Sequence, residues 1–178
     1  MNESISTAQA GDRVTAMKLP IWISSWEIEC CQPDAIVGQP WTTYPYLNLG
    51  AFPWWSDSAT QPIPSEVANL GVVTLDGTIS THDERTTITT EGVTLPIVGT
   101  PATTPIIGRL IVDAHTGGDP HPITGTVQQI VGIKYLRKDG EPTAQLPPVE
   151  LHSTLDRDNH PDGFDEYLVT LHTDENHN

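Results

Sequence analysis

The chain has 178 residues and a mass of 19.4 kDa, the size of one ordinary domain with a real hydrophobic core. Its 23 acidic side chains outnumber 8 Lys and Arg and give a formal net charge of -15, so nucleic-acid backbones are unfavourable partners. Sixteen prolines and fourteen glycines interrupt the chain too often for long helices and favour short strands joined by turns.

The two ends of the chain are polar and lack hydrophobic periodicity. We expect residues 1–16 to form a disordered N-terminal extension, residues 17–173 a single β-rich domain and residues 174–178 a flexible tail. The sequence has neither an apolar run long enough to span a bilayer nor the apolar core of a secretory signal. It therefore predicts a cytoplasmic protein that does not enter a membrane.

Residues 19–31 give the first clear pattern. Apolar and polar side chains alternate on both sides of a break at Ser24 and Ser25, which predicts two half-buried strand segments joined by a bulge or bend. In the second segment Trp26, Ile28 and Cys30 would share one face. We expect Trp26, together with Trp22 of the first segment, to anchor the core.

The only two cysteines, Cys30 and Cys31, are neighbours in the sequence. A disulfide between adjacent residues closes a tight ring, far from the usual geometry of such bonds. We therefore predict two reduced thiols in a strand, one facing the core and one facing solvent. A nucleophilic Cys31 is the alternative, although it has no local sequence signature.

Aromatic side chains concentrate in residues 41–55. Six of the eleven aromatic residues of the chain lie there: Trp41, Tyr44, Tyr46, Phe52, Trp54 and Trp55. Interspersed prolines prevent continuous strand pairing, which predicts an irregular loop. Large, rigid side chains supply contact area at low entropic cost, so we predict that these six residues form a recognition surface. The alternative is a lid that covers one open end of the core.

The rest of the chain is typical of short strands. Asp76-Gly77 predicts a two-residue hairpin turn between strands at 72–75 and 78–80, and Asp139-Gly140 predicts another turn. Residues 95–105 contain three prolines and predict a surface connection. The other predicted strands span residues 86–90 (an edge strand), 106–114, 124–135, 149–155 and 166–173 (an interior strand).

About seven to nine strands without a convincing helical period predict an all-β fold. Gly125 and Gly132, inside one predicted strand, favour a close approach or a bend that curls the sheet. We therefore expect a small, partly open β-barrel or sandwich that carries a long aromatic loop.

Residues 17–38 resemble the beginning of a family of small, uncharacterised actinobacterial proteins. The resemblance rests on two tryptophans four residues apart, a vicinal cysteine pair and a Val-Gly step: Trp22, Trp26, Cys30, Cys31, Val37 and Gly38. A weaker patch at residues 125–130 resembles the second half of the family. The resemblance implies no activity or cofactor. Family members begin near Met17, which implies that residues 1–16 are an extension or that translation starts at Met17.

One acidic loop resembles a calcium site in part. With Asp158 at the first position of an EF-hand loop, Asp162 falls at the fifth, as calcium coordination requires. His160 and Val169, however, occupy the third and twelfth positions, so the bidentate acid is missing. We predict a solvated turn without a bound metal.

A second candidate metal site combines His115, Asp119 and His121 within seven residues. Two imidazoles and a carboxylate suit zinc or iron. A loop rich in Gly and Pro holds such ligands loosely, so we predict a polar surface turn here as well. The sequence therefore predicts no cofactor.

Signatures of nucleophilic, zinc-protease and nucleotide-binding sites (GxSxG, HExxH, GxxxxGK, GxGxxG) are absent from the sequence. We predict a non-catalytic, cytoplasmic module that binds a protein or a small molecule through its aromatic segment. The alternative is an enzyme with a composite site of histidines and carboxylates from the later loops. An acidic decoy for a nucleic-acid-binding protein is a third, weaker hypothesis.

Overall fold

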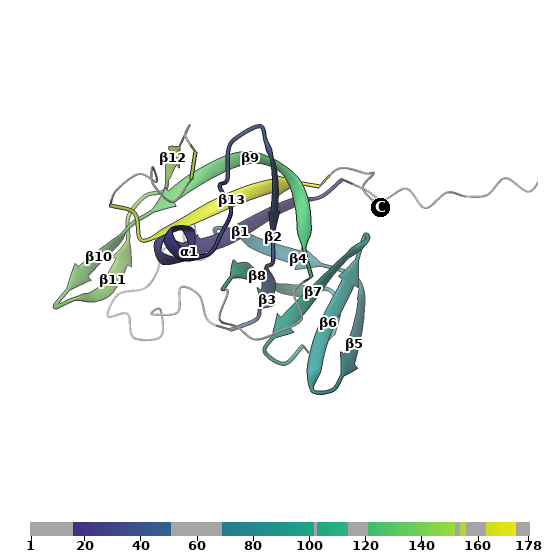
Figure 1. Ribbon diagram of the computed structural model, residues 1–178. Coiled ribbons are helices and arrows are strands. Elements are labelled where there is room, and N and C mark those ends of the chain that lie inside the picture. Colours follow the sequence, from purple (N-terminus) through teal and green to yellow (C-terminus); the bar gives the residue numbers. More distant parts are fainter. Residues whose placement is uncertain are drawn as a thin grey trace, which may run out of the picture.

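The computed structural model describes residues 16–50, 69–101, 103–113, 121–151, 154–155 and 163–173 (Figure 1). Apart from Ala16, the predicted N-terminal extension lies outside the described residues, as does the predicted C-terminal tail. None of the helices in the described ranges has the length and apolar character needed to cross a membrane.

The fold is all-β, as predicted. One short helix, α1 (Ser25–Cys30), follows the first of the described strands, which are β1 (Lys18–Ser24), β2 (Pro40–Thr43), β3 (Tyr46–Asn48), β4 (Val72–Leu75), β5 (Thr78–His82), β6 (Arg85–Thr90), β7 (Val93–Val98), β8 (Ile106–Val112), β9 (Ile123–Ile133), β10 (Tyr135–Lys138), β11 (Glu141–Gln145), β12 (Val149–Leu151) and β13 (Glu166–His172).

Most strands join one mixed sheet in the order β12-β9-β13-β1-β8-β3-β7-β6-β5, and β10 and β11 form a separate ribbon. In the described residues β12 and β5 end this order without pairing with each other, so the sheet is open. The curved β9 runs above β13 and β1, whereas β5, β6 and β7 splay away at the lower right (Figure 1). The sheet therefore curls without closing.

Strand β1 lies in the middle of the sheet. Ile21 pairs with Val169 of β13 in antiparallel register and with Leu110 of β8 in parallel register. These three side chains are fully buried. The interior position predicted for the last strand is confirmed, because β13 lies between β1 and β9. Strand β1 thus links the last described strand, β13, to β8 from the middle of the chain.

The long strand β9 pairs with three described strands along its length, β2, β12 and β13. Thr126 pairs with both Pro40 of β2 and His172 of β13, so β2 and β13 flank β9 on opposite sides. A Cβ atom at Gly125 would lie 2.6 Å from the His172 carbonyl oxygen, and one at Gly132 would lie 2.6 Å from the Phe164 ring. The close approach predicted for these two glycines is confirmed.

The predicted edge strand at residues 86–90 is instead an inner strand. Strand β6 lies between β5 and β7, and β5 ends the sheet. Threonine hydroxyls meet across these strands, at 3.2 Å between Thr81 and Thr86 and at 3.1 Å between Thr89 and Thr94. Cross-strand Thr pairs stabilise neighbouring strands, so a polar, β-branched sequence here does not mark an edge.

The predicted hairpin around Asp76-Gly77 is wrong, although its two strands exist. Strand β4 pairs with β8 and β5 pairs with β6. Gly77 allows a close approach instead of a turn, because a Cβ atom there would collide with the Thr89 carbonyl. The turn at Asp139-Gly140 is confirmed: both residues have positive φ angles, 54° and 88°, and they connect β10 to β11.

The surface connection predicted at residues 95–105 is wrong over its first part. Strand β7 continues to Val98, and Leu95 is fully buried. Pro96 pairs with Thr87 of β6, while β3 pairs only with Ile97 and Val98. Pro96 therefore lies beyond the end of β3, where a missing backbone N–H is tolerated.

Gly71 fixes the position of the buried Trp22. Its φ is 62°, and a Cβ atom there would collide with the Trp22 indole nitrogen and lie 2.9 Å from Leu168. We predict that Gly71→Ala lowers the free energy of unfolding by about 2 to 4 kcal/mol, through backbone strain and overpacking together.

Gly140→Ala is the matched control. Gly140 also has a positive φ, 88°, but a Cβ atom at this position would meet no neighbouring atom within 4 Å. We expect the substitution to cost about 1 kcal/mol from backbone strain alone. Urea denaturation of both variants measures the difference. Equal losses would contradict tight packing of Gly71 against the indole.

Candidate functional site

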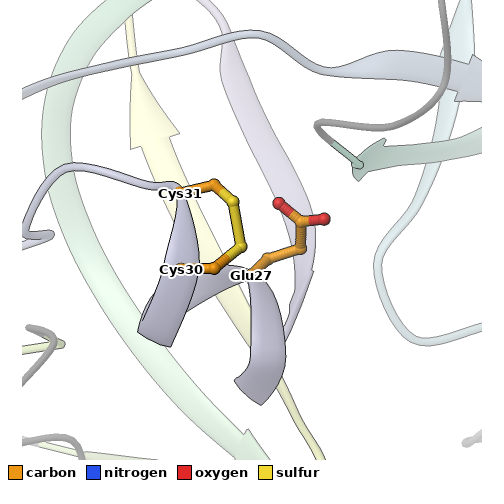
Figure 2. A group of neighbouring side chains, drawn as sticks. All are labelled: Glu27, Cys30 and Cys31. Atoms are coloured by element: carbon orange, nitrogen blue, oxygen red, sulfur yellow. A yellow bond between two sulfur atoms is a disulfide. The ribbon is translucent and has the colours of Figure 1, made fainter.

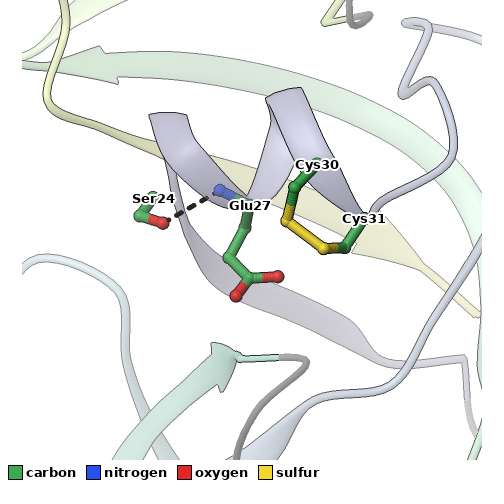
Figure 3. Close-up of a disulfide and its surroundings, with 4 residues drawn as sticks. All are labelled: Ser24, Glu27, Cys30 and Cys31. Carbon is green, nitrogen blue, oxygen red and sulfur yellow. Dashed lines mark hydrogen bonds between the residues drawn. A yellow bond between two sulfur atoms is a disulfide. The ribbon is translucent and has the colours of Figure 1, made fainter.

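The chain turns from β1 directly into α1 at Ser24. The Ser24 hydroxyl accepts a hydrogen bond from the Glu27 backbone N–H at 3.2 Å, which caps the helix (Figure 3). The predicted second strand segment at residues 26–30 is therefore wrong. In the helix Glu27 is buried, with 3% of its surface exposed, whereas Trp26 is 52% exposed. The predicted core anchor is confirmed for Trp22 only.

The two cysteines form a disulfide, so the prediction of reduced thiols is wrong. Cys31 lies just after α1, and its Cα is 3.7 Å from that of Cys30. The disulfide and the Glu27 carboxylate lie on the same side of α1, with their sulfur and oxygen atoms within 4.8 Å of one another (Figure 2). Metal coordination requires thiolates, so this cluster can hold a soft metal only after reduction.

A cleft of about 1120 Å³ lies next to the disulfide. Cys31, Tyr44 and Tyr46 line it from the N-terminal part of the chain. Its remaining described lining comes mainly from β5, β6 and β7, from the turn between β5 and β6, and from Val112, Asp113 and His121. Strands far apart in the sequence therefore form one concave surface.

Charged side chains gather at the β5–β6 turn. Asp83 and Glu84 have positive φ angles, 45° and 65°, as a tight two-residue hairpin turn requires. His82 and Asp83 pair at 2.9 Å, and both side chains are almost fully exposed. The described lining of the cleft includes three carboxyl groups, those of Asp83, Glu84 and Asp113. It includes one Arg, Arg85.

A smaller pocket of about 300 Å³ adjoins this cleft. The two cavities share Tyr46, Val112 and Asp113 as lining residues. The pocket extends along the β1–α1 junction, where Trp22, Trp26 and Glu27 line it, and Glu166 at the start of β13 completes it. It thus combines aromatic rings with carboxyl groups.

Glu166 belongs to a polar network at the base of the β10–β11 ribbon. Its carboxylate accepts a hydrogen bond from the Tyr135 hydroxyl. Asp165 accepts one from the Tyr135 backbone N–H at 2.8 Å and another from Arg137 at 2.5 Å. Burial raises the pKa of Glu166 to about 7 and Asp165 adds to the rise, whereas the Tyr135 hydrogen bond opposes it.

The predicted aromatic surface divides into parts with different roles. Trp41 is a core residue, and its indole N–H donates to the Pro33 carbonyl at 2.9 Å, so it does not belong to a recognition surface. Tyr44 and Tyr46 do line the cleft. The loop is not irregular throughout, because β2 and β3 occupy part of it. Phe52, Trp54 and Trp55 lie outside the described residues.

Of the candidate metal ligands, only His121 falls in the described residues, and it lines the cleft. His115, Asp119, Asp158 and Asp162 lie outside them. Sequence reasoning missed Glu27 and Glu166 as site residues. For Glu27 a signal existed, because Ser24 and Glu27 have the Ser-x-x-Glu spacing of a helix capping box.

No protein-family model, curated protein or solved structure matches this chain. The function is therefore inferred from the geometry of the site.

The disulfide predicts a simple labelling result. Without a reductant, iodoacetamide should leave the intact mass of the denatured protein unchanged, because a disulfide does not react as a thiolate does. After reduction, the same treatment should add two carbamidomethyl groups, one on each of Cys30 and Cys31. The Cys30→Ser/Cys31→Ser variant should gain none in either condition. Labelling of the unreduced wild type would show that the thiols are free.

The raised pKa of Glu166 predicts a loss of stability with rising pH. Between about 4.5 and 7 the folded state keeps the Glu166 proton while the unfolded chain has lost it, so stability falls across this range and stays low above it. Glu166→Gln removes this contribution and can still accept the Tyr135 hydrogen bond. From pH 5.5 to pH 8 we expect the variant to gain about 2 kcal/mol relative to wild type.

Urea denaturation at the two pH values measures this gain. Glu150→Gln, at an exposed carboxyl of β12, is the control and should follow the wild-type pH dependence. A gain of the same size in the control, or none in Glu166→Gln, would contradict the assignment of the raised pKa to Glu166.

Proposed function

We propose that this protein is a non-catalytic binding module whose ligand is an extended segment of another polypeptide, held in the cleft beside Tyr44 and Tyr46. The observation that carries the proposal is the size of the cleft. At about 1120 Å³ it exceeds the roughly 300–1,000 Å³ of most small-molecule pockets. An extended segment fills such a volume better than a compact metabolite does.

The chemistry of the lining supports a peptide ligand. Tyrosine side chains provide large contact areas and hydrogen-bonding groups at low entropic cost. Hydroxyl groups of Thr86 and Thr87 on β6 add hydrogen-bonding capacity. The excess of carboxyl groups over Arg85, together with the net charge of -15, favours a basic segment. Phe52, Trp54 and Trp55 stay predicted members of the recognition surface.

Two expectations from the sequence belong to the same proposal. The first is membership of the actinobacterial family that shares the paired tryptophans and vicinal cysteines. The second is a cytoplasmic location. Most cytoplasmic proteins keep their thiols reduced, and the disulfides that occur there are mainly redox-active. In the proposed location, the bond between Cys30 and Cys31 would therefore form and break reversibly.

An enzyme is the second candidate, because His82, His121 and Asp113 line the same cleft. General acid–base catalysis needs groups held in place near the substrate. The paired His82 and Asp83 instead lie on an almost fully exposed turn. Binding is therefore the better-supported function. Turnover of ester, phosphate or glycoside substrates that His121→Ala abolishes would favour the enzyme.

Tyr44 gives the most direct test of the cleft. We predict that peptides selected on the wild-type protein from a displayed random library are rich in Lys and Arg. We also predict that they bind at least about tenfold more weakly to Tyr44→Ala, because truncating an aromatic hot-spot residue costs about 2 kcal/mol or more and about 1.4 kcal/mol is already tenfold. Fluorescence anisotropy with labelled peptides measures the affinities.

Leu136→Ala is the matched control. Leu136 is 50% exposed, close to the 48% of Tyr44, but lies on the β10–β11 ribbon outside the cleft lining. It should bind with wild-type affinity. The Trp54→Ala/Trp55→Ala variant tests the rest of the aromatic segment in the same assay. Peptides that bind Tyr44→Ala and wild type equally, or no selection above background, would refute the proposal.

A further inference from the structure

The smaller pocket beside the cleft has a lining unlike the rest of the surface. Among its lining residues, Trp22 is buried, with 2% of its surface exposed, whereas Trp26 is half exposed. Tyr46 lines both the pocket and the cleft. The described lining of this small pocket therefore includes three aromatic residues.

The polar part of the lining is acidic. Glu27 comes from α1, Asp113 directly follows β8, and Glu166 begins β13, so three separate parts of the chain bring carboxyl groups to one small volume. The described lining of this pocket includes no Lys, Arg or His. Burying a carboxylate costs free energy, and a bound cation offsets part of that cost.

Aromatic rings and carboxyl groups together select one class of ligand. The faces of Trp and Tyr rings attract cations, and the attraction grows when the site is shielded from water. A metal ion would contact the carboxylates but would gain little from the indoles. An alkylammonium group, with a positive charge spread over apolar carbon, matches both kinds of lining.

We infer that this pocket binds an alkylammonium group, such as a quaternary ammonium headgroup or a lysine side chain. The inference deepens the proposed function, because the pocket shares Tyr46 and Asp113 with the cleft and would take a cationic group of the same ligand. Its volume of about 300 Å³ lies at the lower end of the usual range for ligand pockets and suits such a group.

Local packing holds the aromatic wall in place. Gly71 lies against the Trp22 indole, and Leu168 belongs to the same hydrophobic cluster as Trp22. The strand pairing of Trp22 with Leu168 and Ile111 fixes its backbone. The Ser24 cap fixes the start of α1, from which Trp26 and Glu27 project. The pocket is thus built from regular elements, which pre-organises it for a ligand.

The test compares choline with 3,3-dimethylbutan-1-ol, a neutral compound of the same shape in which carbon replaces the nitrogen. Isothermal titration calorimetry with the full chain measures both affinities. We expect choline to bind about tenfold more tightly than the neutral compound, the combined effect of cation–π contacts and nearby carboxylates. Equal affinities, or no binding of any alkylammonium ion at about 10 mM, would overturn the inference.

Two variants locate the binding. Trp26→Ala should weaken choline binding about two- to fivefold, and Trp26→Phe should restore part of it because it returns an aromatic face. Leu136→Ala, an exposed apolar truncation on the β10–β11 ribbon, should have no effect. Choline binding that survives Trp26→Ala unchanged would place the ion elsewhere and overturn the inference.

Nα-acetyl-lysine amide distinguishes the two sources of the alkylammonium group. Tighter binding of this compound than of choline supports a lysine side chain of a polypeptide, and the reverse supports a free quaternary ion. Either result supports the inference. If choline binds and selected peptides do not, the alkylammonium pocket is supported and the proposed polypeptide ligand is refuted. If selected peptides bind and no alkylammonium ion does, the polypeptide ligand is supported and the alkylammonium pocket is refuted.

The pH dependence gives an independent readout. Glu166 faces Tyr135 and Asp165, the latter paired with Arg137, and it shares the pocket with Glu27 and Asp113. A bound cation favours the ionised form of Glu166, whose pKa burial raises to about 7. Choline should therefore bind more weakly at pH 6 than at pH 8, by severalfold. Glu166→Gln should remove most of that difference, and an unchanged pH profile in this variant would contradict the part assigned to Glu166.

Discussion

The pairing of β1 with both β13 and β8 is the constraint on which the rest of the structure depends. A strand from the start of the chain lies between the last strand and a strand from the middle, so the sheet cannot form until distant segments meet. The same pairing buries Trp22 and Ile21. Without β1, the sheet would divide into the β9–β13 part and the β8–β3–β7–β6–β5 part.

The end of β1 also lines the smaller pocket, which we propose binds a cationic group. At Ser24 the chain leaves the sheet and begins α1, which turns Glu27 inward and leaves Trp26 exposed beside the buried Trp22. Residues 26–30 predicted a strand because their apolar and acidic side chains alternate with a period of two. The Ser24-Glu27 capping spacing was the competing local signal. Glu166, by contrast, reaches the pocket only through strand pairing and had no signal in the sequence.

Alternation and turn residues predicted many of the strands, but not β2, β3 or β7, which lie in or overlap segments predicted as a loop or a connection. The partners of the strands were not predictable. Asp139-Gly140 and Asp76-Gly77 are the same dipeptide, yet only the first forms a hairpin turn. Gly77 instead allows the backbone to pass close to the Thr89 carbonyl of β6. Because β6 comes later in the chain, the local sequence around Gly77 does not reveal this contact. The vicinal disulfide was missed because its two Cα atoms lie 3.7 Å apart, closer than the roughly 4.4–6.8 Å of most disulfides.

We propose that the junction of β1 and α1 forms a pocket for a cationic group. Intermolecular nuclear Overhauser effects between the methyl protons of bound choline and the protein test it most directly. The structure predicts cross-peaks to the indole protons of Trp22 and Trp26 and to the ring protons of Tyr46. Cross-peaks confined to residues outside this pocket would contradict the claim.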